Sequence, residues 1–253
     1  MSRFAPRVLY LSVAVEPPWN RSDKNLVRLV AKNLQRYRGE VLTHEGALPV
    51  LDNVATQAAW GPRTSFEPGL MQRIGLFNRV LADTDAQLVH LFWPADLVVA
   101  SIVRGACGLR GLPMIHTMVR APRTTVAIKW TTAGRPVVCL SRATLERVQR
   151  EATVEAIHIP PGVRPALELA PGRDAAIRER YGLPHGKPLC IYAGDYQHSN
   201  AARTVAATVP RVLREIDCHF VMACRLRNLG DREEEARIKE AITADGLAHH
   251  VSF

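Results

Sequence analysis

The sequence predicts an α/β protein in which two successive domains are each built around a mostly parallel sheet. Short apolar segments of strand length alternate with amphipathic segments of helix length over residues 1–165, and the alternation starts again over residues 188–253. Between them, residues 166–187 are rich in proline, glycine and charge, as linkers between domains often are. Because short connections join the alternating segments, we expect parallel sheets with helices on both faces. The second domain has too few segments to close, so it is predicted to be incomplete.

The first domain is predicted to hold six strands, each an apolar run, and four helices with apolar residues at helical spacing. Ser22 or Asp23 is expected to cap the first helix, and Ser141 the last one. No pattern is readable over residues 45–68. The expected strands are 7–15, 40–44, 87–92, 113–119, 136–140 and 156–159, and the expected helices are 24–38, 69–81, 95–109 and 142–152.

The second domain is expected to open with the stretch LCIYAGDYQHSNAA, which we interpret as a strand, a polar loop led by Gly194, and a helix. Such a loop points free backbone N–H groups at the carboxyl edge of a sheet, where phosphates favour the helix N-terminus. A phosphorylated ligand is therefore expected here first. The expected strands are 189–193, 218–223 and 249–253, and the expected helices are 174–181 in the linker, 200–216 and 231–244.

The composition is that of a soluble globular protein, with 47% hydrophobic and 23% charged residues among 253. No apolar run reaches the roughly 20 residues that span a bilayer, and the N-terminal apolar run lacks a signal-peptide cleavage pattern. The five scattered cysteines, without a C-x-x-C pair, indicate core thiols in a reducing compartment. We therefore expect a cytoplasmic protein.

The net charge of +9 lies mostly near the N-terminus, where residues 1–38 hold eight basic and two acidic side chains, a balance of +6. This favours an anionic partner, such as phospholipid headgroups, a phosphorylated substrate or nucleic acid, or else a solvated basic face. Lys24, Arg28 and Lys32 follow one another at intervals of four and form one ridge of the expected helix. The ridge predicts peripheral contact with an anionic membrane at its inner face, although solvated ridges of this length are common.

Several known site motifs are absent from the sequence. The turn after the first strand has no glycine, which excludes the dinucleotide fingerprint, and the chain has neither a P-loop nor a G-x-S-x-G elbow. His249 and His250 have no second cluster at ligand spacing, so no metal is expected. Without a reading motif or interleaved aromatic residues, nucleic acid is not an expected partner.

Four short blocks, in their order and spacing, resemble the retaining GT-B glycosyltransferases of glycosyltransferase family 4. They are VLYLSVAVEPPWN, then QLVHLFWPADL with GLPMIHT, then VVCLSRATLERV with IHIPPGV, then CIYAGDYQHSNAARTV. The resemblance implies two Rossmann-like domains of the GT-B type, the second incomplete, because the paired glutamates that grip the donor ribose would lie beyond residue 253. It also implies transfer of a sugar from a nucleotide-sugar to an acceptor held between the domains, with retention and without a metal or other cofactor.

On the donor side, the resemblance points to Gly194, Asp195, Ser199, Asn200 and Arg203. The family holds the diphosphate with an arginine after the glycine and a lysine a few residues later, and these positions are Asp195 and Asn200 here. An aspartate repels a phosphate unless another cation intervenes. Arg203 is the nearest candidate for that cation, and its alternative role is that of a surface helix arginine.

On the acceptor side, the resemblance points to Trp19, Asn20, His90, Trp93 and Arg120. The two tryptophans can stack on a sugar or lipid acceptor, or pack at a domain edge. His90 can contact the acceptor or be a core histidine, and Arg120 can bind an anionic acceptor or be solvated. The family's glycine-rich turn is replaced at Asn20 by a turn without glycine, and no catalytic residue is indicated.

These departures leave two hypotheses of different class. The first is a glycosyltransferase, or the greater part of one, that uses a nucleotide-sugar donor. The second is a non-catalytic homologue or fragment that binds a partner and completes or regulates an intact transferase. The four blocks favour the first hypothesis, whereas the changed donor loop and the missing half of the second domain favour the second.

Overall fold

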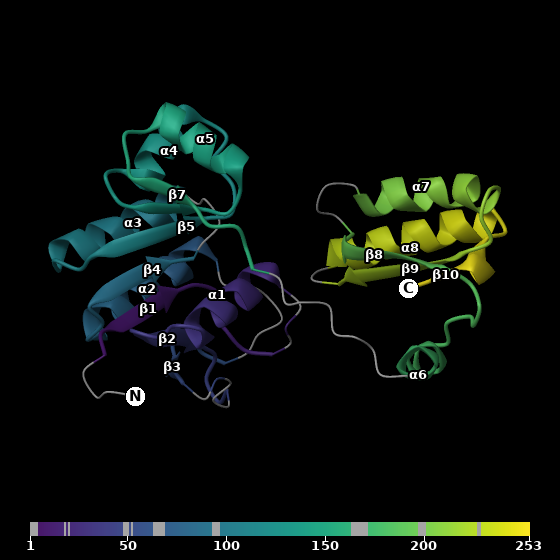
Figure 1. Cartoon of the computed structure of the whole chain (residues 1–253), viewed down its shortest axis with the longest axis horizontal. Coiled ribbons are helices and arrows are strands. Elements are labelled where there is room, and N and C mark those ends of the chain that lie inside the picture. Colours follow the sequence, from purple (N-terminus) through teal and green to yellow (C-terminus); the bar gives the residue numbers. More distant parts are fainter. Residues whose placement is uncertain are drawn as a thin grey trace. The chain divides into compact units, whose positions relative to one another are not determined.

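The chain forms two compact units, unit 1 (Met1–Val163) and unit 2 (Arg164–Phe253). Figure 1 labels their helices and strands. The computed structural model describes residues 5–17, 19, 21–47, 51, 53–62, 69–92, 97–162, 172–196, 201–226 and 229–253.

Within the described residues, unit 1 contains a seven-stranded sheet in the order β3-β2-β1-β4-β5-β6-β7, with all neighbouring strands parallel. The chain runs outward from β1 to β3 and then returns to the other side of β1 for β4, so the strand order reverses at β1. In open parallel sheets, ligands bind at the carboxyl edge beside such a reversal. The strands are β1 (Arg7–Leu11), β2 (Arg38–Thr43), β3 (Val54–Ala58), β4 (Leu88–Leu91), β5 (Met114–Met118), β6 (Val137–Cys139) and β7 (Ala156–His158). The helices are α1 (Ser22–Lys32), α2 (Leu70–Asp83), α3 (Leu97–Leu109), α4 (Thr125–Thr132) and α5 (Arg142–Glu151).

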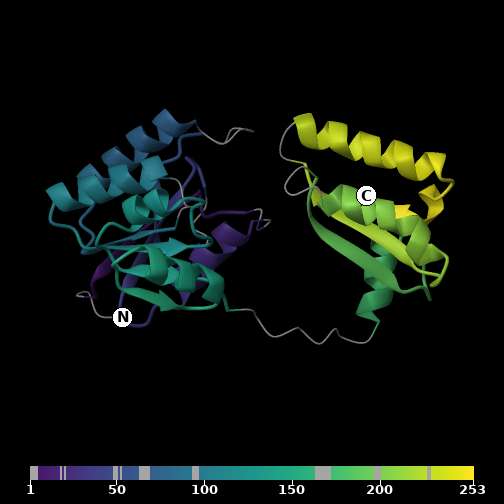
Figure 2. The ribbon, with the colours of Figure 1, turned by 90° about the horizontal axis from the view of Figure 1, so that it is seen from above.

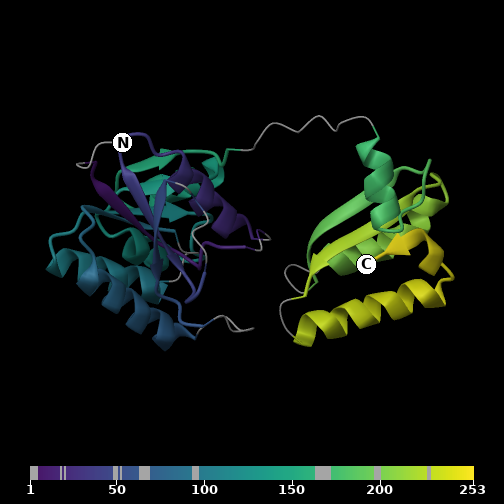
Figure 3. The same cartoon turned by 90° about the horizontal axis from the view of Figure 1, so that it is seen from below.

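Alternate residues of β1 point to opposite faces of this sheet and enter two different cores. Leu9 and Leu11 pack with residues of α2 and α3, whereas Val8 and Tyr10 join a core with Val27 of α1. All five side chains are at most 3% exposed. Figures 2 and 3 show α2 and α3 on one side of the sheet and α1 on the other. The predicted helical cover on both faces is thus confirmed for unit 1.

The sequence analysis missed two elements of unit 1. β3 lies in the stretch without a readable pattern, because only one of its five residues is buried and an edge strand needs little apolar character. α4 lies in a stretch to which no element was assigned from the sequence, and Thr124 caps it by accepting a hydrogen bond from the backbone N of Ala127 at 3.2 Å. Helix α1 ends at Lys32 instead of continuing to Arg38, which is already the first residue of β2.

The expected helix caps have different outcomes. Ser141 caps α5 as predicted, since its Oγ accepts a hydrogen bond from the backbone N of Thr144 at 3.2 Å. The predicted cap of α1 by Ser22 or Asp23 is wrong, because the N-cap is Arg21 and makes no side-chain capping bond. Asp23 lies in the first turn instead, where its carboxylate accepts two hydrogen bonds from the Arg21 guanidinium.

Unit 2 contains, in its described part, three parallel strands in the order β10-β9-β8, which is the order of the first half of a doubly wound domain. α7 and α8 pack on one face of this sheet, where Phe220 and Met222 meet Ile238 (Figure 2). On the other face Ile191 is 62% exposed and Ala223 is exposed, so the described helices leave this face open. The second domain is therefore incomplete, as predicted. Its elements are α6 (Arg173–Arg180), β8 (Leu189–Asp195), α7 (Ala201–Leu213), β9 (His219–Arg225), α8 (Leu229–Ala244), the 3-10 helix η1 (Ala248–His250) and β10 (Val251–Ser252).

Candidate functional site

The carboxyl edge of the unit 2 sheet carries a bidentate ion pair. β8 ends at Asp195 and β9 ends at Arg225, and the parallel register places these two residues opposite each other. The Arg225 guanidinium donates from Nε to Asp195 Oδ1 at 2.8 Å and from Nη2 to Asp195 Oδ2 at 2.9 Å. Arg225 is therefore the cation that lies beside Asp195. It was not identified from the sequence, where Arg203 was the nearest candidate.

Gly194 lies inside β8, so its predicted place at the head of the loop is wrong. It belongs to the β8–β9 ladder, where it pairs with Cys224. A Cβ at Gly194 would lie 2.5 Å from the hydroxyl of Tyr192, whose ring crosses the strand at this point. A side chain at this position would therefore displace the Tyr192 ring, a reason for glycine that differs from the backbone access inferred from the sequence. Tyr196, two residues further on, is buried, and its burial and the nearby Glu235 raise its pKa.

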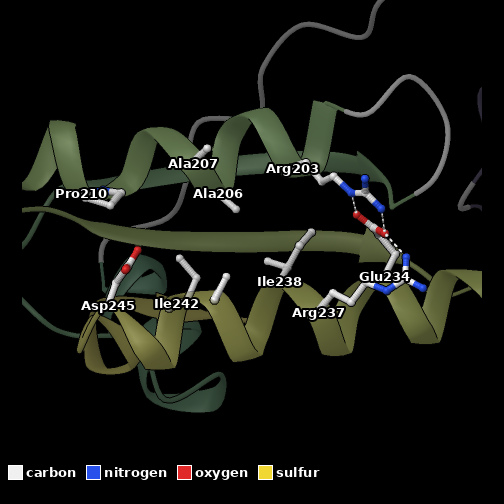
Figure 4. A pocket seen from close by; sticks show the side chains of 10 residues that line it. Arg203, Ala206, Ala207, Pro210, Glu234, Arg237, Ile238, Ile242 and Asp245 are labelled. Atoms are coloured by element: carbon white, nitrogen blue, oxygen red, sulfur yellow. Dashed lines mark hydrogen bonds and ion pairs between the residues drawn. The ribbon is translucent and has the colours of Figure 1, made fainter.

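Arg203 lies in the first turn of α7, as expected, but its guanidinium is already engaged. It donates two hydrogen bonds to the carboxylate of Glu234 on α8, and Arg237 Nη1 lies 3.6 Å from the same carboxylate (Figure 4). The hydrogen bonds and charge of Arg203 lower the pKa of Glu234, with a smaller contribution from Arg237. The same hydrogen bonds and the Glu234 charge raise the pKa of Arg203.

This three-residue cluster closes one end of a groove of about 620 Å³ between α7 and α8. Asp245 lies at the other end, and small or aliphatic side chains line the middle (Figure 4). The structure thus ties Arg203 to the contact between two helices. Of the remaining donor-side candidates, Ser199 and Asn200 lie outside the described residues.

The acceptor-side candidates fall into different surroundings. His90 lies inside β4, where its Nε2 is 2.8 Å from Thr117 Oγ1 and its ring packs 5.3 Å from Tyr10 and 4.4 Å from Phe92 between ring centroids. Burial, with a smaller effect of a neighbouring histidine, lowers the pKa of His90 to about 3, so it is neutral near pH 7. These surroundings favour the core interpretation of His90. Arg120 is exposed two residues after β5, and its role stays a prediction.

The basic ridge of α1 is only partly exposed, so the prediction of three exposed cations is wrong. Lys24 is 9% exposed, because α1 turns this side chain inward. The Arg28 guanidinium lies 4.2 Å from the ring centroid of Trp19, in a cation–π contact that covers this face of the tryptophan. Lys32 is exposed. Two further acceptor-side candidates, Asn20 and Trp93, lie outside the described residues.

A second pairing of a carboxylate with a basic side chain lies at the carboxyl edge of the unit 1 sheet. Glu16, in the loop after β1, accepts a hydrogen bond from the backbone N of His44 at 3.1 Å, and its other oxygen lies 3.1 Å from His44 Nδ1. His44 directly follows β2, the strand that pairs with β1. The sequence analysis assigned these residues to a turn and a strand end. The signal that could have found them is a polar residue at the end of an apolar run, since Glu16 follows the expected strand 7–15 and His44 directly follows β2.

Neither membrane helices nor metal clusters occur in the part of the chain that the structure describes. None of these helices combines the length and the apolar character needed to cross a membrane. The described residues also contain no group of three or more His, Cys, Asp or Glu side chains that could hold a metal ion.

Comparisons with known proteins identify the fold. No protein-family model matches the sequence, and no curated protein matches it. A solved glycosyltransferase from Rickettsia africae ESF-5 matches with a TM-score of 0.63 at 15% identity, over 98% of this chain and 68% of that chain. Anabaena Alr3699/HepE, solved in complex with UDP, matches with a TM-score of 0.61 at 12% identity, over 98% of this chain and 68% of that one. WaaG, a glycosyltransferase involved in lipopolysaccharide biosynthesis, matches with a TM-score of 0.59 at 15% identity, over 98% and 69% of the two chains.

These similarities show that the chain shares the GT-B fold of the three solved structures. The predicted fold class is therefore confirmed. The chain spans about two thirds of the length of each solved structure, since the matches cover 68%, 68% and 69% of them.

Proposed function

We propose that this chain transfers a sugar from a nucleotide-sugar donor to an acceptor, and that the donor diphosphate binds at the carboxyl edge of the unit 2 sheet. The observation that carries the proposal is the placement of Arg225 beside Asp195 at the ends of β8 and β9. The GT-B fold supports it, as does the UDP bound to one of the structures that share this fold.

The chemistry of this edge suits a diphosphate. α7 and α8 each begin just after a strand, so their N-terminal backbone N–H groups and partial positive charge lie near the strand ends. Arg225 neutralises Asp195, and its side chain is 30% exposed. During transfer, negative charge grows on the departing diphosphate, and fixed N–H groups and cations stabilise that charge most in the transition state. Ser199 and Asn200 come just before α7 and add polar side chains to this proposal.

The finer parts of the proposal come from the resemblance in sequence. It supports transfer with retention of the anomeric configuration and without a metal ion. Proton NMR of the glycoside product tests the first point, because the coupling constant of the anomeric proton distinguishes the two configurations for sugars of the glucose series.

Calorimetric titration of the full chain with UDP and with GDP tests the proposed function. A donor site should bind one of the two nucleotides, and binding of neither would contradict the proposal. Arg203→Ala measures how far Arg203 takes part. Because Arg203 lies at the contact between α7 and α8, whereas Arg225 ends β9 at the proposed site, we expect a smaller loss of affinity than from Arg225→Ala. Arg211→Ala is the matched control, because Arg211 is an exposed arginine in the last turn of the same helix.

A specific observation also favours the second hypothesis, a non-catalytic homologue or fragment that binds a partner. The face of the unit 2 sheet that carries Ile191 and Ala223 is exposed, whereas parallel sheets are ordinarily covered on both faces. A partner-binding protein of this kind should bind neither nucleotide, so the same titration discriminates the two functions.

Peripheral contact with an anionic membrane is a separate proposal, supported by the basic balance of residues 1–38 and now resting on Lys32 with Arg28. Lys32→Glu should weaken sedimentation with vesicles that contain phosphatidylglycerol, because surface binding depends on charge attraction. Lys129→Glu, at an exposed position of α4, is the matched control. Equal binding of both variants and the wild type would contradict the contact.

A further inference from the structure

The groove between α7 and α8 is apolar along its middle (Figure 4). It has a volume of about 620 Å³. Ile238 and Ile242 of α8 form its floor and are at most 4% exposed, whereas Ala207 and Ala241 are exposed at its rim. The exposure of these two alanines shows that the groove is open to a partner.

The two ends of the groove carry opposite charge (Figure 4). At one end, Arg203 and Arg237 share the single carboxylate of Glu234, which leaves one positive charge in excess. The two arginine side chains are 54% and 64% exposed, whereas that of Glu234 is 5% exposed. At the other end lies Asp245, an exposed carboxylate directly after the last residue of α8. An occupant of the groove therefore needs an acidic group at the first end and a basic group at the second.

α8 itself carries these two groups at matching positions. Arg237, Ala241 and Asp245 follow one another at intervals of four and lie along one face of the helix. The helical spacing holds as far as Asp245, since its backbone N donates to the carbonyl O of Ala241 at 3.1 Å. A two-fold axis at Ala241 therefore brings Arg237 of each copy opposite Asp245 of the other. The short side chain of Ala241, at the centre, allows the two helices to approach closely.

We propose that this groove is the interface of a homodimer, in which α8 of a second copy lies antiparallel to α8 and covers the groove of the first. The contact is isologous, because both copies contribute the same surface and the two-fold axis closes the assembly. Arg237 of each copy pairs with Asp245 of the other, and the aliphatic part of the arginine side chain covers the apolar middle. The inference is independent of the proposed function, because it concerns α7 and α8 alone and requires no ligand.

The charges select the second copy and its direction. The alanines at the rim offer little apolar area, so an apolar surface without charges gains little by entering the groove. A parallel second copy would place like charges opposite each other, which is costly at an interface. Because exposed ion pairs are individually weak, the dimer is expected to dissociate reversibly on dilution.

Sedimentation equilibrium of the full chain over a series of concentrations tests the proposal. The wild type is expected to change from monomer to dimer as its concentration rises, and a monomer at every concentration would overturn the inference. Asp245→Arg should raise the dissociation constant of the dimer at least about tenfold, because both symmetry-related contacts become repulsive. This variant is also the safest for folding, since a basic side chain is favourable at the C-terminus of a helix. An unchanged dissociation constant would overturn the inference.

A mixture of two variants gives the sharpest outcome. Arg237→Asp alone should also fail to dimerise, since it brings carboxylates together at both contacts. An equimolar mixture of Arg237→Asp and Asp245→Arg should dimerise again, because one copy then carries two acidic and the other two basic side chains. Circular dichroism checks that each variant is folded. Folded variants that do not associate on mixing would contradict the antiparallel pairing.

Control variants separate this pairing from a change in net charge. Arg232→Asp and Glu240→Arg reverse exposed charges of α8 that do not line the groove, and both should leave the dissociation constant unchanged. An equal rise in these controls would overturn the inference. A dimer that Ile191→Glu abolishes but Asp245→Arg does not would place the interface on the open face of the unit 2 sheet and would overturn it as well.

Discussion

The carboxyl edges of the two sheets both carry a carboxylate paired with a basic side chain across neighbouring parallel strands, but the basic partners differ. In unit 1 the pair is Glu16 with His44, and in unit 2 it is Asp195 with Arg225. An arginine stays charged at every pH of biological interest, whereas an imidazole exchanges a proton near neutrality. The same backbone arrangement therefore joins a carboxylate to a guanidinium in unit 2 and to an imidazole in unit 1.

Removing the fixed charge of unit 2 should have the largest effect on nucleotide binding. Arg225→Ala is expected to weaken UDP binding about 10–100-fold, because a hydrogen bond to a charged group contributes about 1.5–3 kcal/mol and the carboxylate of Asp195 would then face the phosphates unpaired. Calorimetry measures the change, with Arg211→Ala as the control at an exposed position. Unchanged affinity would show that Arg225 takes no part in the donor site.

Filling the space under Tyr192 should disturb the edge of unit 2 through packing alone. A Cβ at Gly194 would lie 2.5 Å from the Tyr192 hydroxyl, so Gly194→Ala is expected to destabilise the protein by about 1–3 kcal/mol, the usual cost of overpacking. Urea denaturation measures this loss. In a Tyr192→Leu background the same substitution should cost clearly less, since the obstructing atoms are gone. An equal loss of unfolding free energy in both backgrounds would show that the Tyr192 ring does not restrict position 194 to glycine.

Lowering the pH should have a smaller effect, a loss of folding stability. It acts through the ion pairs of Glu234 with Arg203 and Arg237 in unit 2. Arg203 and, less strongly, Arg237 lower the pKa of Glu234 below its usual value. A carboxyl whose pKa is lowered on folding binds fewer protons in the folded state, so its contribution is complete above the unfolded pKa and is lost as pH falls through the lowered folded pKa. Urea denaturation between pH 7 and pH 3 should show this acid dependence reduced in Glu234→Gln. An unchanged profile would contradict the pairing.

Local patterns in the sequence predicted much of the fold, because apolar periodicity reports which residues face a core. This periodicity located the strands around Leu9 and Phe220. The residue type and place of Ser141 predicted the helix cap. The same patterns located the strand that ends at Asp195, and hence the place of the candidate donor site, but put Gly194 in the loop because its pairing partner was not known.

The partners at both edges could not be predicted, because pairing across parallel strands joins residues that are distant in the chain. Asp195 and Arg225 are 30 residues apart, and Glu16 and His44 are 28 apart. Which residues meet depends on the register of the strands, and a local pattern does not encode it. The same limit applies to Lys24, whose helical spacing placed it on a ridge but did not tell which side of the ridge is buried.

A crystal structure of the full chain with UDP would show whether the diphosphate binds at the carboxyl edge of the unit 2 sheet. We expect density for the diphosphate at the ends of β8 and β9, with the Arg225 guanidinium within hydrogen-bond distance of a phosphate oxygen. Nucleotide bound in the groove between α7 and α8 instead, beside Arg203 and Glu234, would contradict the proposed donor site.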